Sequence, residues 1–198
     1  MEIEAKMRLT DRPAIERRLK ELGAERAAEL LEINTYFDTD QRQLKSSDQG
    51  LRVRIEETAD GQRQATITHK GPRAHGRLKS RSETEVAIAD ANDAAQLLRA
   101  LGYMPVLSFE KRRRRWRLDG VHVELDVLPY LGAFIEIEGP SDEAVLGVRE
   151  KLGLNDTPLI RASYIAMLMS YIRENQLRTQ SVRFDGEAEA VADVQVTP

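Results

Sequence analysis

Charged side chains occupy every second position along several stretches of this sequence. Glu2, Glu4 and Lys6 alternate with apolar residues near the N-terminus, and Glu136 and Glu138 do so much further along the chain. Because successive side chains of a β-strand point to opposite faces, charges two positions apart share one face. Carboxylates can hold divalent cations there, and Lys or Arg can hold phosphate groups. The pattern therefore indicates a ligand with several charges, such as a polyphosphate accompanied by divalent metal ions.

The composition narrows the classes of protein to which the chain can belong. Its 198 residues suit one domain, and a hydrophobic content of 41% is enough to form a core. The 30 Lys and Arg against 33 Asp and Glu give a net charge of −3, which is not typical of a nucleic-acid-binding protein. Without cysteine there is no disulfide, thiolate zinc site or Cys nucleophile. No apolar run approaches the ~18 residues that cross a bilayer, and the charged N-terminus is unlike a secretory signal. We therefore expect a cytoplasmic protein without a membrane partner.

The positions of apolar residues predict the elements that carry these charges. Alternation predicts eight strands, at 2–8, 34–38, 51–56, 64–70, 81–86, 109–118, 121–128 and 133–138. Helical spacing predicts four helices, at 11–22, 91–101, 141–152 and 161–175. A strand followed by a helix and a Leu-Gly stop occurs at 2–23 and again at 83–102, a weak internal repeat. We expect one domain over 1–175 and a flexible tail over 176–198, which lacks periodicity.

A sheet with one face in water is the simplest explanation of alternating charge. Here, however, the polar positions are mostly Lys, Arg, Glu and Asp, and four helices carry apolar stripes that must cover something. We therefore predict an α+β fold: a closed eight-stranded antiparallel β-barrel with a charged lumen, its apolar outer face covered by helices. A charged interior is costly unless its charges pair or bind ions, which again favours a multiply charged ligand.

Several motifs in this order resemble the CYTH superfamily, the triphosphate tunnel metalloenzymes. The resemblance spans about residues 1–173 and is strongest to the CyaB-like subgroup named after class IV adenylyl cyclases. It rests on Glu2-Ile3-Glu4-Ala5-Lys6, Tyr36-Phe37-Asp38, Leu51-Arg52-Val53-Arg54, Lys70-Gly71-Pro72, Arg81-x-Glu83-x-Glu85, Glu110-Lys111-x-Arg113, Glu124-Leu125-Asp126, Phe134-Ile135-Glu136-Ile137-Glu138 and Ile160-Arg161-x-Ser163-Tyr164.

The resemblance implies a tunnel that binds a triphosphate with one or two Mg²⁺ or Mn²⁺ ions. On the matching positions, the metal ligands are expected to be Glu2, Glu4, Glu124, Asp126, Glu136 and Glu138. The phosphate-binding residues are expected to be Lys6, Arg52, Arg54, Lys70, Arg81, Lys111 and Arg113, with Arg81 either in direct contact or in a supporting network with Glu83 and Glu85. Catalysis is expected to depend on Glu136, Asp126 and Lys111.

The run from Arg112 to Arg115 could suggest a nucleic-acid-binding patch. On a strand, however, Arg113 and Arg115 point to the lumen with Lys111, while Arg112 and Arg114 point outward and can pair with acidic helix residues. This parity argues against a nucleic-acid partner.

Three functions are compatible with the sequence. We favour metal-dependent hydrolysis of inorganic or organic triphosphates, such as tripolyphosphate, thiamine triphosphate or a nucleoside triphosphate, because hydrolysis needs no base pocket. The alternatives are a class IV adenylyl cyclase, which converts ATP to cyclic AMP and pyrophosphate, and a non-catalytic sensor of polyphosphate or nucleotide. A homodimer is expected from the resemblance only.

Overall fold

The computed structural model describes residues 2–74, 76 and 78–184, and the structural statements below refer to these residues. They form nine strands: β1 (Glu2–Arg8), β2 (Glu25–Asp38), β3 (Gly50–Thr58), β4 (Arg63–Ala74), β5 (Lys79–Ile88), β6 (Met104–Leu118), β7 (Val121–Leu128), β8 (Gly132–Gly139) and β9 (Ser181–Val182). Five helices accompany them: α1 (Arg12–Glu21), α2 (Gln43–Ser46), α3 (Ala91–Ala100), α4 (Asp142–Lys151) and α5 (Tyr164–Glu174). No described helix is both long and apolar enough to cross a membrane.

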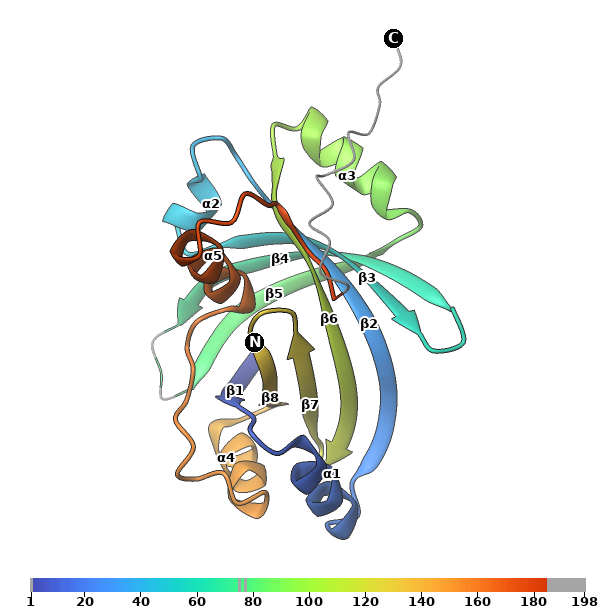
Figure 1. Ribbon diagram of the computed structural model, residues 1–198, viewed down its shortest axis with the longest axis vertical. Coiled ribbons are helices and arrows are strands. Elements are labelled where there is room, and N and C mark those ends of the chain that lie inside the picture. Colours follow the sequence, from blue (N-terminus) through green and yellow to red (C-terminus); the bar gives the residue numbers. More distant parts are fainter. Residues whose placement is uncertain (1, 75, 77, 185–198) are drawn as a thin grey trace.

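Eight strands close into an antiparallel barrel, which confirms the predicted fold (Figure 1). The strands follow the order β2-β3-β4-β5-β1-β8-β7-β6, and pairing of β6 with β2 closes the ring. This order has a two-fold pattern. If β1, β2, β3 and β4 are exchanged with β5, β6, β7 and β8 respectively, every pair of neighbouring strands is again a pair of neighbours. The weak internal repeat of the sequence therefore corresponds to two halves of the barrel.

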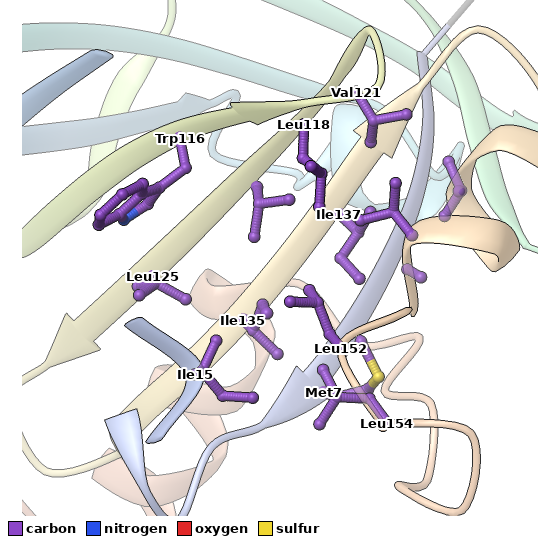
Figure 2. Close-up of a cluster of buried hydrophobic side chains, with 14 of the residues drawn as sticks. Met7, Ile15, Trp116, Leu118, Val121, Leu125, Ile135, Ile137, Leu152 and Leu154 are labelled. Carbon is purple, nitrogen blue, oxygen red and sulfur yellow. The ribbon is translucent and has the colours of Figure 1, made fainter. Parts of the chain in front are cut away.

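The largest apolar core lies outside the barrel wall, as predicted (Figure 2). Met7 of β1, Val123 of β7 and Ile137 of β8 are fully buried and alternate with charged residues that face the other way. Leu19 of α1 and Val145 of α4 pack against this face. The side chain of Asp11 caps α1 by accepting a bond from the N–H of Ala14 at 2.9 Å.

A smaller cluster joins α3 to the opposite side of the barrel. Leu98 of α3 packs with Phe37 of β2 and Val53 of β3. Asp90 caps α3 and accepts bonds from the N–H groups of Asn92 and Asp93. Three of the four predicted helices thus cover the outer face of the barrel.

The fourth predicted helix, α5, lies elsewhere than expected. Its residues Leu168 and Ile172 pack against Phe109, Leu128 and Phe134. Those three side chains share the strand parity of Lys111, Asp126 and Glu136, so they belong to the inner face of the barrel. The inner face becomes apolar at one end, and α5 covers that end.

Part of the predicted tail also contacts the barrel. Ser181 and Val182 pair with Ser108 and Phe109 of β6 in parallel, and Val182 is buried in the α5 cluster. Packing therefore continues beyond residue 175, and residues 185–198 lie outside the described part of the chain.

Candidate active site in the barrel lumen

The lumen holds a cavity of about 940 Å³. Lys and Arg outnumber Asp and Glu among the described residues that line it. The cavity reaches from the strands to α2 and α5, which lie at the same end of the barrel (Figure 1). A cavity with more positive than negative side chains is suited to an anionic ligand.

Carboxylates gather on the wall formed by β7 and β8. Glu124 of β7 lies directly opposite Glu136 of β8 in the register, a like-charge pair that is unfavourable by itself. Arg113 compensates for it, because its guanidinium contacts Glu124 and lies 2.7 Å from Glu136. Burial alone would raise the pKa of Glu136, but Lys6, Arg113 and other lumen cations lower that pKa well below its ordinary value. Glu136 is therefore ionised.

Asp126, an inward residue of the same wall on β7, is fully buried. Its two oxygens accept bonds from Arg113 at 2.7 and 2.6 Å, and Lys111 lies 3.3 Å away. The hydroxyl of Tyr164, the first residue of α5, donates to the same carboxylate at 2.9 Å. Asp126 thus holds two expected phosphate ligands and anchors α5, while Glu124, Glu136 and Glu138 line the cavity itself.

Lys6 lies between two of the expected metal ligands, Glu4 of β1 and Glu136 of β8. Its ammonium group lies 3.5 Å from Glu4 and 3.0 Å from Glu136, and it donates to the carbonyl of Ala162 at 3.2 Å. Burial alone would lower the pKa of Lys6, but Glu136 and Glu4 raise it. Lys79, which the sequence analysis did not single out, donates to both oxygens of Glu4 at 2.8 and 2.9 Å.

Cations gather on the wall formed by β3, β4 and β5. Arg52 is almost fully buried, donates to Thr68 at 3.0 Å and lies 3.5 Å from Glu85. Lys70 pairs with Glu83, and Arg81 lies 3.8 Å from Asp48. Among the described residues, the buried Nε atoms of Arg52 and Arg81 have no hydrogen-bond partner. Two buried guanidinium N–H donors of this wall are therefore unsatisfied.

The positive potential of this wall lowers the pKa of Tyr36. Burial alone would raise the pKa of its phenol, but Arg52, Lys70, Arg54 and Lys79 together lower it. Burial and the neighbouring Arg54 also lower the pKa of Arg52. Positive charge is thus in excess here, and a bound anion would relieve the repulsion.

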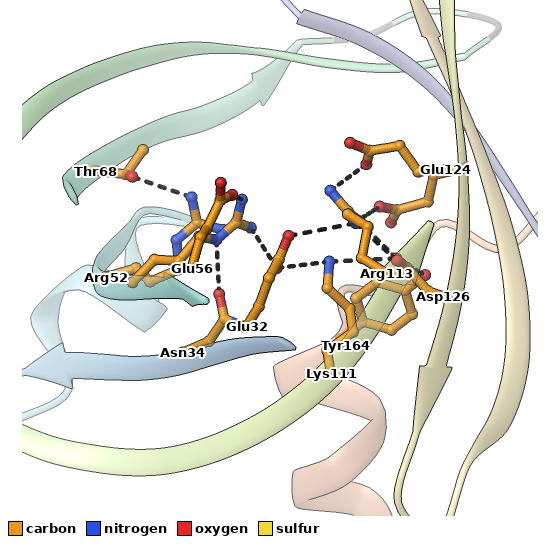
Figure 3. Close-up of polar contacts among 12 residues, drawn as sticks. Glu32, Asn34, Arg52, Glu56, Thr68, Lys111, Arg113, Glu124, Asp126 and Tyr164 are labelled. Atoms are coloured by element: carbon orange, nitrogen blue, oxygen red, sulfur yellow. Dashed lines mark hydrogen bonds and ion pairs between the residues drawn. The ribbon is translucent and has the colours of Figure 1, made fainter. Parts of the chain in front are cut away.

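Glu32 is the main lumen residue that the sequence analysis missed (Figure 3). It is fully buried, and nitrogen atoms of four cations lie within 3.5 Å of its carboxylate. These cations are Lys111 at 3.0 Å, Arg54 and Arg113 at 3.4 Å, and Arg115 at 3.5 Å. In the sequence, the position of Glu32 is indicated only by one charged residue between the apolar residues Leu31 and Ile33.

The expected metal ligands fit a divalent cation by their chemistry. Glu4 of β1 lies directly opposite Glu138 of β8, so two hard oxygen ligands face the cavity side by side. Within the described residues, however, no group of three or more His, Asp or Glu side chains is close enough to hold a metal alone. Phosphate oxygens and water would have to complete the shell, which is how Mg²⁺ is commonly bound. Glu2 lies on β1, and its side chain is outside the described part.

The arginine run has the predicted parity. Arg113 points inward to Asp126, whereas Arg114 points outward and pairs with Glu16 of α1 at 2.7 Å and Glu29 at 2.9 Å. Arg112 also points away from the lumen, with its guanidinium over the ring of Phe184. The run is therefore divided between two faces of the wall.

The chain belongs to the CYTH domain family, whose domain matches residues 1–164. It is 33% identical to the adenylate cyclase CyaB of Aeromonas hydrophila over 173 residues, 82% of this chain and 86% of that protein. The solved structure of PH1819 from Pyrococcus horikoshii OT3 is similar, with a TM-score of 0.76 and 29% identity over 86% of this chain and 99% of that one. The fold is also shared by HpAC1 from Hippeastrum, with a TM-score of 0.66 and 23% identity over 86% of this chain and 96% of that one. HpAC1 is described as a putative adenylyl cyclase with a dominant triphosphatase activity.

Proposed function

We propose that this protein is a divalent-metal-dependent enzyme that binds a triphosphate in the barrel lumen and hydrolyses it. The observation that carries the proposal is the division of charge between two walls. In the ring of eight strands, β3 and β4 stand four strands away from β8 and β7, so the cationic wall and the carboxylate wall face each other. A triphosphate and its metal ions need both kinds of group at once.

Each wall has a separate task in this proposal. Arg52, Arg54, Lys70 and Arg81 hold the phosphate oxygens, and Arg can do so through two parallel hydrogen bonds. Lys111 and Arg113 neutralise charge that develops on the transferred phosphoryl group. Asp126 fixes the orientation of both by its bonds to them. One or two metal ions, each held by at most two of Glu4, Glu136 and Glu138 together with phosphate oxygens and water, would polarise the phosphate and lower the pKa of bound water.

Cyclisation of ATP is the second candidate, and the kinship with CyaB favours it. The same groups would hold the phosphates, while the ribose 3′-hydroxyl would attack the α-phosphorus and release pyrophosphate. Hydrolysis has fewer geometric requirements than cyclisation, since the site does not have to hold the ribose in a position for attack. The activity described for HpAC1 is consistent with hydrolysis in this fold.

Product analysis separates these functions. The purified chain is incubated with ATP and, separately, with tripolyphosphate, each with Mg²⁺, Mn²⁺ or a chelator. Orthophosphate from tripolyphosphate without cyclic AMP from ATP supports hydrolysis. Cyclic AMP with equimolar pyrophosphate supports the cyclase, and binding without turnover supports a sensor.

Two variants test the roles of the walls. Lys70→Ala removes a cation from the phosphate wall and should raise KM about tenfold or more, since a charged hydrogen bond contributes roughly 1.5–3 kcal/mol. Arg63→Ala is its matched control, because Arg63 lies on the same strand and is 58% exposed. Glu136→Gln should abolish turnover but retain some affinity for the phosphates. Unchanged turnover in Glu136→Gln would contradict the metal-binding role.

A further inference from the structure

The aromatic ring of Tyr164, the first residue of α5, faces two cations of the lumen. The ammonium nitrogen of Lys6 lies 4.0 Å from the centre of the ring, and that of Lys111 lies 5.3 Å from it (Figure 3). Both distances are within the range of about 6 Å over which an aromatic face attracts an ammonium group. All three side chains are buried and line the cavity, so little water weakens the attraction. The ring thus connects a cation of β1 with a cation of β6.

The ring holds these ammonium groups differently from the carboxylates around them. Glu136 lies 3.0 Å from Lys6, and Glu32 lies 3.0 Å from Lys111. A carboxylate neutralises the cation that it contacts, whereas an aromatic ring attracts it through a quadrupole and carries no net charge. The contact with Tyr164 therefore restricts the position of each ammonium group without reducing the positive charge that a phosphate would meet.

Tyr164 is itself held firmly at the start of α5. Ser163 caps the helix. The preceding segment is attached to β1, because the N–H of Ile160 donates to the backbone carbonyl of Lys6 at 2.8 Å. Phe134 packs edge-on against the ring, with the ring centres 5.3 Å apart. The motif that ends at Tyr164, to which the phosphate and metal sites assign no role, thus places an aromatic ring against Lys6.

The hydroxyl and the ring of Tyr164 make separate contacts. The hydroxyl donates to Asp126 at 2.9 Å, and the ring faces Lys6 and Lys111. Phenylalanine would keep the ring without the hydroxyl, and leucine would lack both. Substitution can therefore separate the anchoring of α5 from any effect of the ring on the cations.

We propose that Tyr164 is a positioning residue for phosphate binding, whose ring holds Lys6 and Lys111 in the lumen before the triphosphate binds. A lysine ammonium group is a point charge on a long flexible stem, so fixing it in advance reduces the entropy that is lost when the ligand binds. This inference rests on the proposed function, because it assumes that Lys6 and Lys111 contact the phosphates.

The test compares Tyr164→Phe and Tyr164→Leu with the control Tyr171→Leu. Tyr171 is another aromatic residue of α5; it stacks on Tyr130 with the ring centres 5.0 Å apart, and it is not among the described residues that line the cavity. Calorimetry gives Kd for tripolyphosphate with a chelator present to prevent hydrolysis, and phosphate release with Mg²⁺ gives kcat and KM. Both are measured at a temperature at which circular dichroism shows every variant folded.

Tyr164→Leu should raise Kd and KM for tripolyphosphate about tenfold, and kcat should change less than KM. Tyr164→Phe should restore most of this loss, although it lacks the bond to Asp126. Tyr171→Leu should bind tripolyphosphate as the wild type does, since its ring contacts no lumen cation among the described residues.

A second readout depends on neither ligand nor turnover. In protein labelled with ¹³C-lysine, the ring current of Tyr164 should shift the ε-CH₂ signal of Lys6, which Lys6→Arg identifies by its loss. The shift should persist in Tyr164→Phe and disappear in Tyr164→Leu, because only the leucine variant lacks a ring at this position.

The outcomes separate this inference from the proposed function. Equal losses of affinity in Tyr164→Phe and Tyr164→Leu would overturn the inference, because the hydroxyl and not the ring would then be responsible. A wild-type Kd in Tyr164→Leu would also overturn it, as would an equal loss in Tyr171→Leu. Absence of turnover with every triphosphate would contradict the proposed function, while the Lys6 signal and Kd for tripolyphosphate would still decide the inference.

Discussion

Replacement of Glu32 by Ala should destabilise the protein strongly, because it removes a buried charge shared by four cations. The carboxylate is fully buried, with nitrogen atoms of Lys111, Arg54, Arg113 and Arg115 at 3.0 to 3.5 Å. Removal of one partner from a buried ionic group leaves the others without compensation. That loss typically costs about 3–5 kcal/mol.

The remaining contacts place the expected cost at the lower end of this range. Lys111 keeps Asp126 at 3.3 Å, and Arg54 keeps Glu56 at 3.4 Å. We therefore expect a loss of about 3 kcal/mol in the free energy of unfolding. For a domain of this size each kcal/mol lowers Tm by about 2–4 °C, so Tm should fall by roughly 6–12 °C.

Urea and thermal denaturation followed by circular dichroism measure this loss. Glu57→Ala is the matched control, because Glu57 also forms an ion pair at the barrel wall, with Arg63 at 2.9 Å, but is 36% exposed. Exposed pairs contribute below about 1 kcal/mol. If Glu32→Ala costs no more than Glu57→Ala, the four cations do not depend on Glu32 and the reasoning is refuted. Glu32→Gln, which keeps the volume of the side chain, provides the measurement if the Ala variant does not fold.

Two further predictions concern the same network. Burial alone would raise the pKa of Glu32, but Arg113, Arg54, Lys111 and Arg115 lower it well below its ordinary value. A lowered folded-state pKa contributes stability above the unfolded-state value, about pH 4.3, and that contribution is lost as the pH falls further. The free energy of unfolding should therefore decrease below about pH 4.3, and Glu32→Gln should reduce the slope; identical slopes would contradict the assignment. Tyr164→Phe removes the hydroxyl that donates to Asp126, and it should cost about 1.5–3 kcal/mol in urea denaturation. An unchanged midpoint would show that this bond does not anchor α5.

Strand parity made much of the lumen predictable from the sequence. Side-chain alternation alone placed Lys111 and Arg113 inside the barrel and Arg114 outside, where it meets Glu16 of α1. Glu4, Glu136 and Glu138 line the cavity for the same reason. A period of two residues depends only on local backbone geometry, so it can be read without knowledge of the partners of a strand.

Features that depend on pairing between distant segments could not be predicted. The first half of β2 carries two adjacent leucines, Leu30 and Leu31, and several residues that favour helices, which hides its strand pattern. It is extended because it pairs with β6 along its length, and that pairing brings Glu32 beside Lys111. Glu32 was missed for this reason. The position of α5 likewise depends on the apolar inner residues Phe109 and Phe134, whose parity looks like that of the charged positions.

The two-fold pattern of the barrel gives the division of charge a structural basis. By the order of the strands, β3 and β4 in one half correspond to β7 and β8 in the other. At inward positions β3 carries Arg52 and Arg54, whereas β7 carries Glu124 and Asp126. A symmetric lumen would bind a linear anion equally well in two orientations. Because the halves differ in charge, the proposed function assigns the phosphates to one wall and the metal ions to the other, which favours one orientation of the ligand.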